Sequence, residues 1–493
     1  MKGASVLTVI AVLSFAFLFS VSIHGNQGSV VLSPPQKVIR APAEWETTSY
    51  VLIRWPYDYS GLDSFFLDMT REIAEVCEVK IVVDSQSTAD SVSSYLQNNG
   101  VNMANVSFFI VTTDSIWIRD YGPISVVDVS SGTTEFINMM YDRFGRWDDD
   151  AFPWRYAKAN GITWYNMSDG SKWLRLEGGN YMVDGAGIEY STNRIFEQND
   201  PANGGDLTHD EVVQWMTEYY NLWEFRNVTK MTNDGTGHID MEIKLLNETT
   251  VLISKVDDPS DEDYDILEYN ARFFENHTAR NGMHYNVIRI PLVKDQWTGT
   301  YYTYTNSLIV NNKVLVPIYG ISTDSQALQI YRDAMPGYEI VGIDASNIIG
   351  MNGAIHCTTM QVAKDNKPPQ ISVEGVEAQP NSPVIIRVRV TDDTFLKDVY
   401  LFYNSSLNST IKRVKMNPVG QDIYEATLPS FPSGTKINFF VEAEDGDLAL
   451  NYSGDIKNPH TVIVGSTPEI PGYAGIVFAA TSSTIVYFVR RFS

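Results

Sequence analysis

The chain has 493 residues, of which 44% are hydrophobic and 19% are charged, so it can fill a large core and is neither disordered nor fibrous. Asp and Glu exceed Lys and Arg by 60 to 36, and the resulting net charge of −24 disfavours nucleic acid and favours cationic ligands. An acidic surface that keeps an exported protein soluble explains this charge equally well. With two cysteines, Cys77 and Cys357, the chain is neither a disulfide scaffold nor a Cys-rich zinc protein.

Both ends of the chain are apolar. The uncharged residues 4–23 follow Met1 and Lys2, and we interpret residues 1–26 as a secretory signal peptide or an N-terminal anchor. A second uncharged run, residues 473–489, ends at an arginine pair and predicts that residues 466–493 are a C-terminal membrane anchor or a sorting tail similar to those of archaeal surface proteins. Eight Asn-x-Ser/Thr sequons fit this interpretation. The sequence therefore predicts an extracytoplasmic protein, secreted or anchored to the membrane through its terminal hydrophobic segments.

Helical and strand patterns alternate over residues 33–365, the predicted catalytic domain. Residues 61–79 carry apolar side chains at helical spacing, and a strand is expected at residues 79–83. Thr208 and Glu211 predict a capping box at the start of a helix. Residues 307–318 predict a hairpin that turns at Asn311 and Asn312.

Residues 368–465 have a different character. Short alternating strands, separated by turn residues at intervals of roughly ten residues, predict a β-sandwich. The segment carries no cluster of His, Cys or carboxylates of a catalytic type, so we interpret it as a spacer or docking domain.

Chemically capable residues recur along the larger region at gaps of 57, 61, 68 and 51 residues: Asp120, Glu177, His238, Asn306 and Cys357. Each lies just before or within an apolar strand pattern. A weak period of this length predicts five similar ββαβ-like units whose functional groups converge on a central axis.

Two of these groups adjoin glycine turns. Asp120 is expected at a bend before Gly122-Pro123, beside aromatic residues; an ion pair with Arg119 that holds the turn explains this position equally well. Glu177 precedes Gly178-Gly179, which allows close approach of the backbone, although such turns are common.

His238, Asp240 and Cys357 each have a structural and a chemical interpretation. His238 and Asp240 are expected to share one face of a strand, as a proton switch and a fixed negative charge; a histidine bonded to a backbone carbonyl is the structural alternative. A catalytic cysteine needs a lowered pKa or a cationic partner, and for Cys357 that cation could be the substrate. Core packing and a disulfide with Cys77 are the alternatives.

Together these residues form four ordered motifs that resemble the agmatine deiminase and bacterial, Porphyromonas-type peptidylarginine deiminase family of guanidino-group-modifying enzymes: Trp117-x-Arg119-Asp120-x-Gly122-Pro123, Glu177-Gly178-Gly179-Asn180, Gly237-His238-x-Asp240 and Asn352-Gly353-x-x-His356-Cys357. Residues 42–45 and 54–56 match its N-terminal pattern, and the resemblance covers residues 35–364. It implies an α/β fold, a five-bladed α/β propeller (pentein) with the site on its axis. An immunoglobulin-like β-sandwich after this domain is similar to the secreted peptidylarginine deiminase branch.

The resemblance also implies roles for the residues. Cys357 would attack the guanidino carbon and form a covalent thiouronium intermediate. His238, oriented by Glu177, would protonate the departing ammonia and then activate water. Asp120 and Asp240 would grip the guanidinium bidentately. No metal or organic cofactor is needed.

Substrate contacts are expected from four further residues. Asn306 and Trp117 are placed with the substrate-binding groups, and Arg143 and Arg146 lie where the peptidylarginine enzymes bind a C-terminal carboxylate. Arg146 is one residue out of register, and pairing of both arginines with the acidic residues 148–150 is the alternative.

The leading hypothesis is therefore hydrolytic deimination of peptidyl-arginine, with C-terminal arginine preferred, to citrulline and ammonia. An agmatine or free-arginine deiminase, a catalytically silent surface binding protein, and transfer of the amidino group to an amine are the alternatives. The sequence makes no prediction of the oligomeric state.

Overall fold

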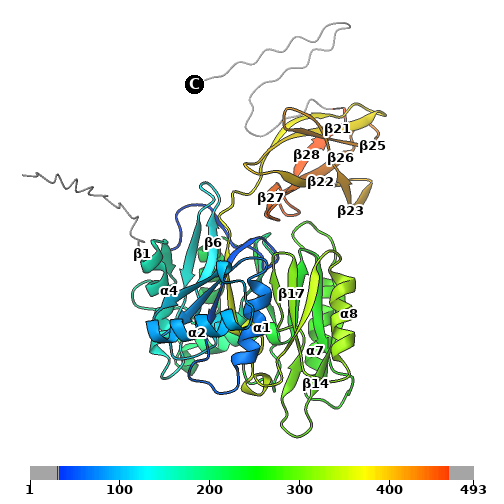
Figure 1. Ribbon diagram of the computed structural model, residues 1–493. Helices are drawn as coiled ribbons and strands as arrows, with labels where there is room; N and C mark the ends of the chain where they lie inside the picture. Colours follow the sequence, from blue (N-terminus) through cyan, green and yellow to red (C-terminus); the bar gives the residue numbers. More distant parts are fainter. Residues whose placement is uncertain (1–29, 32, 466–493) are drawn as a thin grey trace, which may run out of the picture.

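The computed structural model describes residues 30–31 and 33–465. They form a large α/β unit and a smaller β unit, which lies at the top of Figure 1. The two predicted terminal segments, residues 1–26 and 466–493, lie outside the described residues. Within residues 30–31 and 33–465, no helix is long and apolar enough to cross a membrane.

The α/β unit contains five small sheets. In the order in which the strands pair, the first sheet contains β1 (Val30–Val31), β8 (Trp164–Asn166), β7 (Thr134–Asn138), β6 (Ile124–Asp128) and β2 (Ile39–Arg40), and the second contains β11 (Glu224–Val228), β10 (Ile188–Thr192) and β9 (Met182–Val183). The third contains β12 (Ile243–Asn247), β13 (Thr250–Lys255), β14 (Asn286–Lys294) and β15 (Tyr301–Thr303), and the fourth contains β16 (Leu308–Val310), β17 (Lys313–Ile318) and β18 (Glu339–Asp344). The fifth contains β19 (Thr359–Ala363), β3 (Thr48–Arg54), β4 (Glu78–Val83) and β5 (Val106–Ile110).

Every one of these sheets contains the same unit, an antiparallel strand pair whose second strand is followed by a helical crossover and a parallel strand. In the fifth sheet β19, the last strand of the region, pairs antiparallel with the early strand β3. The two ends of the α/β unit are therefore hydrogen-bonded in one sheet.

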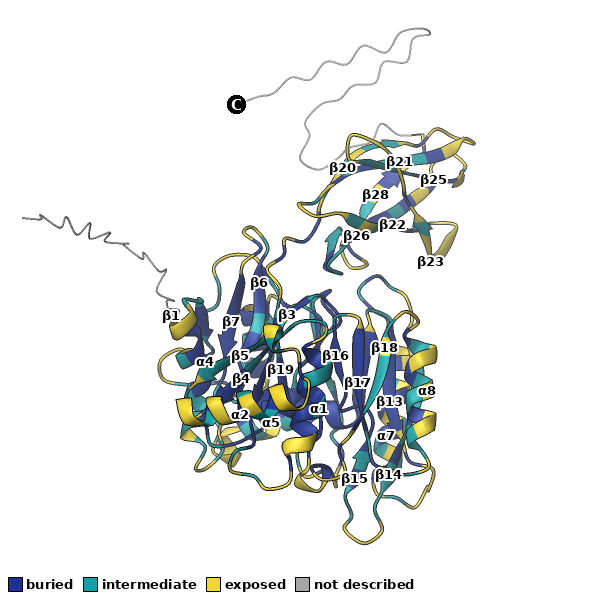
Figure 2. Ribbon diagram, in the orientation of Figure 1, coloured by how far each residue is buried: buried dark blue, intermediate teal, exposed yellow. Residues whose placement is uncertain are grey.

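The helices of this unit are α1 (Asp63–Ile73), α2 (Gln86–Asn98), α3 (Ile118–Tyr121), α4 (Trp147–Asn160), α5 (Arg194–Asn199), α6 (His209–Tyr220), α7 (Tyr264–Asn276) and α8 (Asp324–Ala334). Short 3-10 turns are η1 (Met103–Asn105), η2 (Gly178–Asn180), η3 (Pro201–Asn203), η4 (Ile239–Met241), η5 (Ile349–Met351) and η6 (His356–Thr358). Figure 2 shows buried strands inside, with helices such as α2 and α8 turning exposed faces outward.

Local sequence signals account for several of these elements. The helix expected within residues 61–79 is α1, which ends six residues earlier and buries its apolar stripe. The capping box of Thr208 and Glu211 is confirmed at the start of α6. The hairpin β16–β17 is confirmed as well, and Asn311 at its turn adopts a positive φ of 51°, which asparagine tolerates better than most residues.

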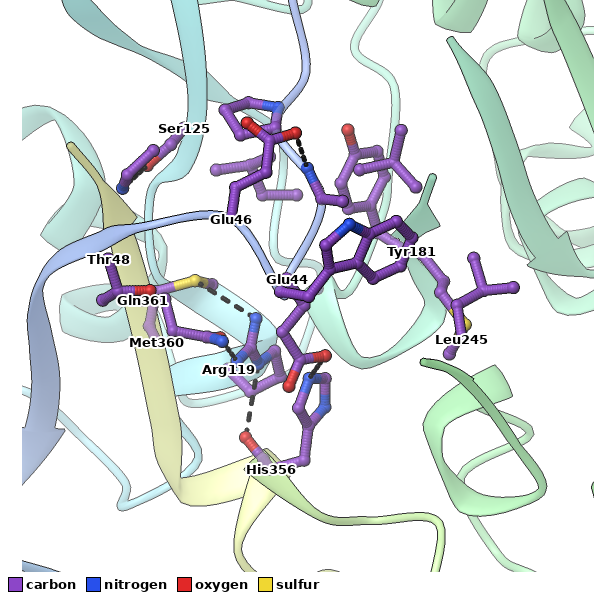
Figure 3. Close-up of a pocket in the computed structure, with 18 of the residues that line it drawn as sticks. Glu44, Glu46, Thr48, Arg119, Ser125, Tyr181, Leu245, His356, Met360 and Gln361 are labelled. Carbon is purple, nitrogen blue, oxygen red and sulfur yellow. Dashed lines mark hydrogen bonds and ion pairs between the residues drawn. The ribbon is translucent and has the colours of Figure 1, made fainter. Parts of the chain in front are cut away.

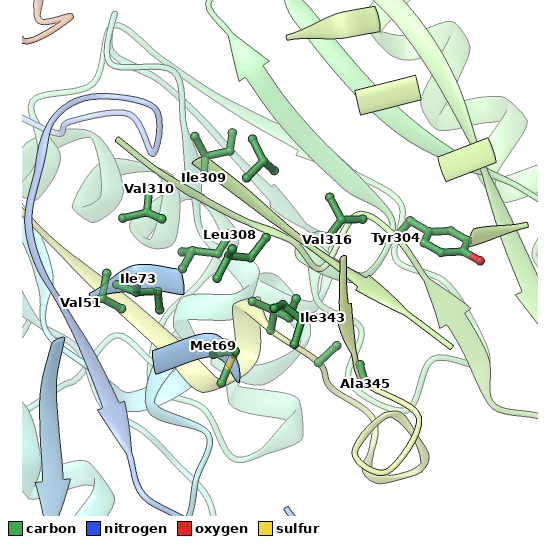
Figure 4. Close-up of a cluster of buried hydrophobic side chains, with 14 of the residues drawn as sticks. Val51, Met69, Ile73, Tyr304, Leu308, Ile309, Val310, Val316, Ile343 and Ala345 are labelled. Carbon is green, nitrogen blue, oxygen red and sulfur yellow. The ribbon is translucent and has the colours of Figure 1, made fainter. Parts of the chain in front are cut away.

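The main hydrophobic core joins neighbouring units. Side chains of α1 and β3 pack with those of β16, β17 and β18, as Figure 4 shows for Val51, Met69, Ile309, Val316 and Ile343. A second core lies between the first sheet and helices α4 and α6. Burial of this continuous apolar surface holds the ends of the sheets, where the polar residues lie, in fixed positions.

The smaller unit consists of two antiparallel sheets. Their strands are β20 (Gln370–Glu377), β21 (Pro383–Thr391), β25 (Ile423–Ser430) and β24 (Asn417–Gly420), and β23 (Asn408–Lys415), β22 (Leu396–Ser405), β26 (Lys436–Asp445), β27 (Leu450–Ser453) and β28 (His460–Ile463). Alternate residues of β21, β22, β25 and β26 share one core, so the two sheets pack face to face as a sandwich.

A polar interface joins the sandwich to the α/β unit. At its centre the carboxyl groups of Glu248 and Glu442, one from each unit, share two donors. Asn281 Nδ2 lies 2.8 Å from Glu248 and 3.2 Å from Glu442, and the Tyr452 hydroxyl donates to both glutamates. Burial and then repulsion from Glu442 raise the pKa of Glu248 well above its usual value, and burial raises the pKa of Glu442.

This pair predicts an interface that weakens as the pH rises. Both carboxyls bind a proton more tightly in the folded protein than in the unfolded chain, where glutamate titrates near pH 4.5. Their contribution to stability is complete below that pH and is lost as the pH rises through the folded-state pKa. We expect Glu442→Gln to unfold at a temperature about 1 °C higher than wild type at pH 8 and to gain little at pH 5, since an unfolding entropy of about 2.1 cal/mol/K per residue makes about 1 kcal/mol shift Tm by that much in a chain of 493 residues.

Thermal unfolding monitored by circular dichroism at the two pH values measures this difference. Glu377→Gln is the matched control, because Glu377 is exposed on β20 of the same sandwich and pairs with Arg387 at the surface. Equal pH dependence of wild type and Glu442→Gln would contradict the assignment.

Candidate active site

The residues predicted from the four motifs come together at the ends of different sheets. Asp120 lies on the one-turn helix α3, Glu177 directly precedes η2, and Cys357 lies on η6. Asp120, Glu177, His238, Asp240 and Cys357 are all buried, with at most 8% of any of them exposed. The polar groups are therefore removed from bulk water and act on one another strongly.

The expected strand through His238 and Asp240 is wrong. His238 is extended, but Ile239–Met241 form the 3-10 turn η4. Gly235 and Gly237 have positive φ angles of 77° and 70°, and the Asp234 carboxylate accepts hydrogen bonds from the N–H groups of Thr236 and Gly237. This loop ends extended pairing, yet it still directs His238 and Asp240 toward the same space.

That space lies over Gly179. A Cβ atom at this glycine would lie 2.5 Å from His238 Nδ1, 3.0 Å from Asp120 Oδ1 and 3.2 Å from Asp240 Oδ2. These three groups therefore converge on Gly179, where no side chain would fit, and we call the region that they border the hollow. Gly178 beside it is equally constrained, since its Cβ would meet the Arg119 carbonyl oxygen at 2.1 Å.

Two of the atoms around Gly179, Asp120 Oδ1 and His238 Nδ1, have no hydrogen-bond partner within the described part of the chain, and neither has Oδ1 of Asp240, whose Oδ2 lies beside them. Asp120 Oδ1 and His238 Nδ1 are 3.6 Å apart. Buried polar atoms are rarely left unpaired without a functional reason. The two free carboxylate oxygens suit a cationic ligand that carries several N–H groups.

His238 is oriented from its other side by Glu177. Its Nε2 contacts the Glu177 carboxylate, so the alternative of a bond to a backbone carbonyl is wrong. Arg143 donates bidentately to the same carboxylate at 2.7 and 2.8 Å, and Arg194 Nη2 lies 3.2 Å from it. Glu177 thus joins the histidine to two arginines.

Cys357 is held by Asn306. The Asn306 Nδ2 group lies 3.1 Å from Cys357 Sγ, and its Oδ1 accepts from the N–H groups of Ala354 at 3.1 Å and Cys357 at 3.3 Å. Asp240 Oδ2 lies 3.7 Å from the sulfur. Both cysteines are free, so the alternative of a Cys77–Cys357 disulfide is wrong.

The charges of the site set its protonation. Burial and the negative charges of Asp240 and Asp120 raise the pKa of the Cys357 thiol well above its usual value. Burial opposes a charge on His238, but Asp120 and Glu177 outweigh it and raise the pKa of His238 to about 9. Without a ligand, the site therefore holds a neutral thiol and a cationic imidazole at neutral pH.

The carboxyl groups of Asp120, Asp240 and Glu177 differ in the direction of their pKa shifts. Burial raises the pKa of Asp120 to about 6, against the opposing charge of His238. For Asp240 burial is outweighed by the hydrogen bond and charge of His356, which lower its pKa, and for Glu177 burial is outweighed by His238 and Arg143. Asp240 and Glu177 are accordingly fixed negative charges.

The remaining predicted residues lie around this centre. Trp117 packs on Gly353, where a Cβ would lie 2.5 Å from the indole and 3.0 Å from Cys357 Cβ. Arg119 does not pair with Asp120; its Nε donates to the His356 carbonyl at 3.3 Å. Arg146 lies 3.4 Å from the buried Asp149, as the alternative of pairing with residues 148–150 expected, whereas Arg143 binds Glu177 instead.

Comparison with known proteins now decides the family. The model of the Porphyromonas-type peptidyl-arginine deiminase family matches residues 40–363. The chain belongs to this family.

Related sequences and solved structures support the membership of the chain in this family. The deiminase is 24% identical over 373 residues to a "Putative agmatine deiminase" of Photobacterium profundum, covering 67% of this chain and 98% of that protein. Its fold is similar to that of the agmatine deiminase of Enterococcus faecalis, with a TM-score of 0.58 at 20% identity over 66% of this chain and 96% of that one. A "Putative Arginine Deiminase" from Porphyromonas gingivalis matches with a TM-score of 0.59 at 22% identity over 66% and 99%.

The deiminase is thus a hydrolase that acts on guanidino C–N bonds, with the α/β fold of the known deiminase structures. Sequence reasoning missed Arg194, which no local signal distinguishes from other exposed arginines. It also missed His356 as a functional group, although His356 lies in the motif beside Cys357 and contacts Asp240 at 2.7 Å.

We expect Gly179→Ala to lower kcat/KM of the deiminase by at least about 100-fold, because the new methyl group would displace the groups that define the hollow and a shift of about 1 Å has that effect on aligned reactants. Steady-state ammonia release measures the loss. Gly350→Ala is the control, since a Cβ there meets nothing within 4 Å. Full activity of Gly179→Ala would show that the hollow is not the binding site.

The raised pKa of Cys357 predicts slow alkylation. At pH 7 iodoacetamide should react with Cys357 at least about tenfold more slowly than with a free thiol of ordinary pKa, since one unit of pKa removes that much thiolate. The rate should rise with pH and be faster at pH 8 in Asp120→Asn, which lacks one repelling charge, although that variant loses turnover. Cys357→Ser corrects for labelling of Cys77, and a fast reaction of wild type at pH 7 would contradict the electrostatic argument.

Proposed function

We propose that this deiminase hydrolyses the guanidino group of peptidyl-arginine, with C-terminal arginine preferred, to citrulline and ammonia. The observation that supports the proposal most is the convergence of two unpartnered carboxylate oxygens and one unpartnered imidazole nitrogen on a hollow beside a buried cysteine. A planar cation with N–H groups on several edges satisfies Asp120 and Asp240 together.

Substrate binding starts the reaction. A bound guanidinium places a positive charge between Asp120, Asp240 and Cys357, and a nearby positive charge lowers the pKa of a thiol. Cys357 then loses its proton to solvent, and its sulfur attacks the guanidino carbon. Asn306, which contacts Sγ at 3.1 Å, holds the sulfur in position.

Loss of ammonia follows. His238, whose Nε2 is occupied by Glu177, has Nδ1 free to give its proton to one amino group. The C–N bond breaks, ammonia leaves, and a thiouronium remains covalently attached to Cys357. The neutral His238 then takes a proton from water, and the resulting hydroxide adds to the same carbon.

Product release regenerates the site. The C–S bond breaks with its electron pair on sulfur, the former hydroxide oxygen becomes the ureido oxygen of citrulline, and its proton passes to solvent. His238 is again protonated, in keeping with its pKa of about 9. Asp120 and Asp240 hold the guanidino group and keep its carbon against the sulfur throughout.

A peptide substrate is supported by the segment between β7 and α4. Arg143 uses Nε and Nη2 on Glu177, and its Nη1 makes no hydrogen bond within the described part of the chain. The Arg146 side chain is 30% exposed and has one long contact to Asp149. The neighbouring Phe144 and Trp147 are 98% and 69% exposed. Cations beside exposed aromatic rings suit a peptide carboxylate and an adjacent side chain.

Agmatine is the second candidate. It is favoured by the names of relatives and solved structures such as the agmatine deiminase of Enterococcus faecalis, and by the commitment of Arg143 to Glu177, which leaves less of its charge for a substrate carboxylate. The product would be carbamoylputrescine.

The proposal also covers the fold and the location of the protein. We infer that the five sheets with their shared ββαβ unit are the blades of a propeller around the hollow, supported by the pairing of β19 with β3, and that the β-sandwich is immunoglobulin-like. We also propose that the protein is exported and tethered to the cell surface, which the two apolar terminal sequences and the eight sequons support.

A substrate panel tests the function. Citrulline or carbamoylputrescine formation is measured with agmatine, free arginine and peptides with internal or C-terminal arginine, using protein without residues 1–26 and 466–493. We expect C-terminal arginine peptides to be the best substrates and Cys357→Ala to abolish turnover. Turnover of agmatine alone would reject the peptide proposal in favour of the second candidate.

Arg146→Gln separates the two candidates further. Arg146 does not contact the reacting groups, whereas a change at Arg143 would also release Glu177. We expect Arg146→Gln to lower kcat/KM about tenfold for C-terminal arginine peptides, the value of one hydrogen bond to a charged group, and to leave agmatine turnover unchanged. An equal effect on both substrates, or none on the peptides, would remove Arg146 from substrate recognition.

A further inference from the structure

A row of polar groups, buried or half-buried, extends from Asp240 through His356 to Glu44. His356 Nδ1 lies 2.7 Å from Asp240 Oδ2, and His356 Nε2 lies 3.4 Å from Glu44 Oε2. Figure 3 shows the Glu44 carboxylate and the His356 ring facing each other. The histidine before the nucleophile is therefore held between two carboxylates, of which only Asp240 reaches the hollow.

Glu44 is itself firmly placed. Lys244 Nζ contacts both of its carboxylate oxygens at 2.5 Å and the Ser307 carbonyl at 2.7 Å, and the N–H of Ile309 at the start of β16 donates to Glu44 Oε1 at 2.8 Å. Burial opposes ionisation of Glu44, but Lys244 and His356 outweigh it and hold its pKa far below the usual range. Glu44 is thus a fixed negative charge behind the His356 ring.

These groups do not belong to the reaction hollow. Glu44, His356 and Arg119 line a cavity of about 90 Å³, which is not lined by Cys357, His238 or Asp240. Glu44 therefore cannot contact a guanidinium that binds over Gly179, and it can act on the reaction only through His356.

We propose that Glu44 is a positioning residue for the deimination reaction, acting through His356 to hold the Asp240 carboxylate, whose Oδ2 lies beside Gly179, in the orientation that leaves Oδ1 free to accept a hydrogen bond from the guanidinium. The inference rests on the proposed function, because Asp240 is assigned there as a substrate-binding group.

The physical reason lies in the hydrogen-bonding capacity of each group. An ionised carboxylate only accepts, so His356 satisfies both Asp240 and Glu44 when each ring nitrogen carries a proton. The hydrogen bond from His356 to Asp240 Oδ2 is then charge-assisted. It fixes the position of Oδ2, while Oδ1 has no hydrogen-bond partner. Without Glu44 the ring loses its second anchor, and Asp240 can rotate Oδ1 away from the substrate.

Glu44→Gln tests the proposal, because glutamine keeps the size and the acceptor for the Ile309 N–H but removes the charge. We expect kcat/KM for agmatine and for a C-terminal arginine peptide to fall between about tenfold and 100-fold, with KM raised and kcat lowered together, because misplacement of a substrate-holding group disturbs both binding and alignment. Glu46→Gln is the matched control: Glu46 is two residues away, lines the same cavity, and pairs with Arg40.

Two further measurements separate positioning from loss of folding. Glu44→Gln leaves the Lys244 ammonium buried without its partner, so the double variant Glu44→Gln with Lys244→Met, which has no unpaired cation, should unfold close to the wild-type temperature and keep the catalytic defect. In protein labelled with ¹⁵N-histidine, the His356 ring resonances should shift in Glu44→Gln, because the ring loses a charged hydrogen-bond partner, and stay unchanged in Glu46→Gln.

The outcomes are distinct. Wild-type kcat and KM in Glu44→Gln, or unchanged His356 resonances in that variant, would overturn the positioning role. Recovery of full activity in the double variant would overturn it too, since the defect of the single variant would then come from the buried ammonium. If wild type itself turns over neither substrate, the proposed function fails, while the His356 resonances still decide whether Glu44 controls the ring.

Discussion

The structure depends on burying ionised carboxylates that each keep an oxygen without a hydrogen-bond partner. Asp120 and Asp240 are buried with one oxygen each that no group of the described chain satisfies. Burial of such charges is costly unless a counter-ion arrives. The hollow over Gly179 is therefore a prepared site for a cation, and the same negative charges that select the cation keep Cys357 a thiol until it binds.

Permanent positive charges are arranged behind this site. Arg143 and Arg194 stabilise Glu177, which orients His238, and Lys244 stabilises Glu44 beside His356. Each cation contacts a carboxylate that faces a histidine, and neither histidine is left with two free nitrogens. The acidic groups are thus compensated from outside the hollow, so the hollow itself stays negative although the surrounding network is nearly balanced.

The fold makes this arrangement possible because every functional group lies at the end of a short, rigid element. Asp120, His238, Asp240 and Cys357 belong to or adjoin single helical turns next to strands that are packed on both faces. The hollow requires glycine at residue 179, and the loop before His238 contains two glycines with positive φ. The β-sandwich lies apart from these groups and contacts the α/β unit through an interface of carboxyl groups that hold their protons tightly.

The amino-acid sequence by itself determined the α/β character of residues 33–365, the sandwich after them and the set of polar residues that meet at the candidate site, because apolar periodicity and short glycine-rich motifs are local properties. It mispredicted the strand at His238, where the Asp234 carboxylate accepts hydrogen bonds from Thr236 and Gly237 in the preceding loop and the backbone turns at Ile239–Met241. Only the tertiary structure decided that Arg143 and Arg194 bind Glu177 and that Glu44 reaches His356. Residues 44 and 356 are 312 positions apart in the sequence, so their contact forms only when the chain folds and no local pattern indicates it.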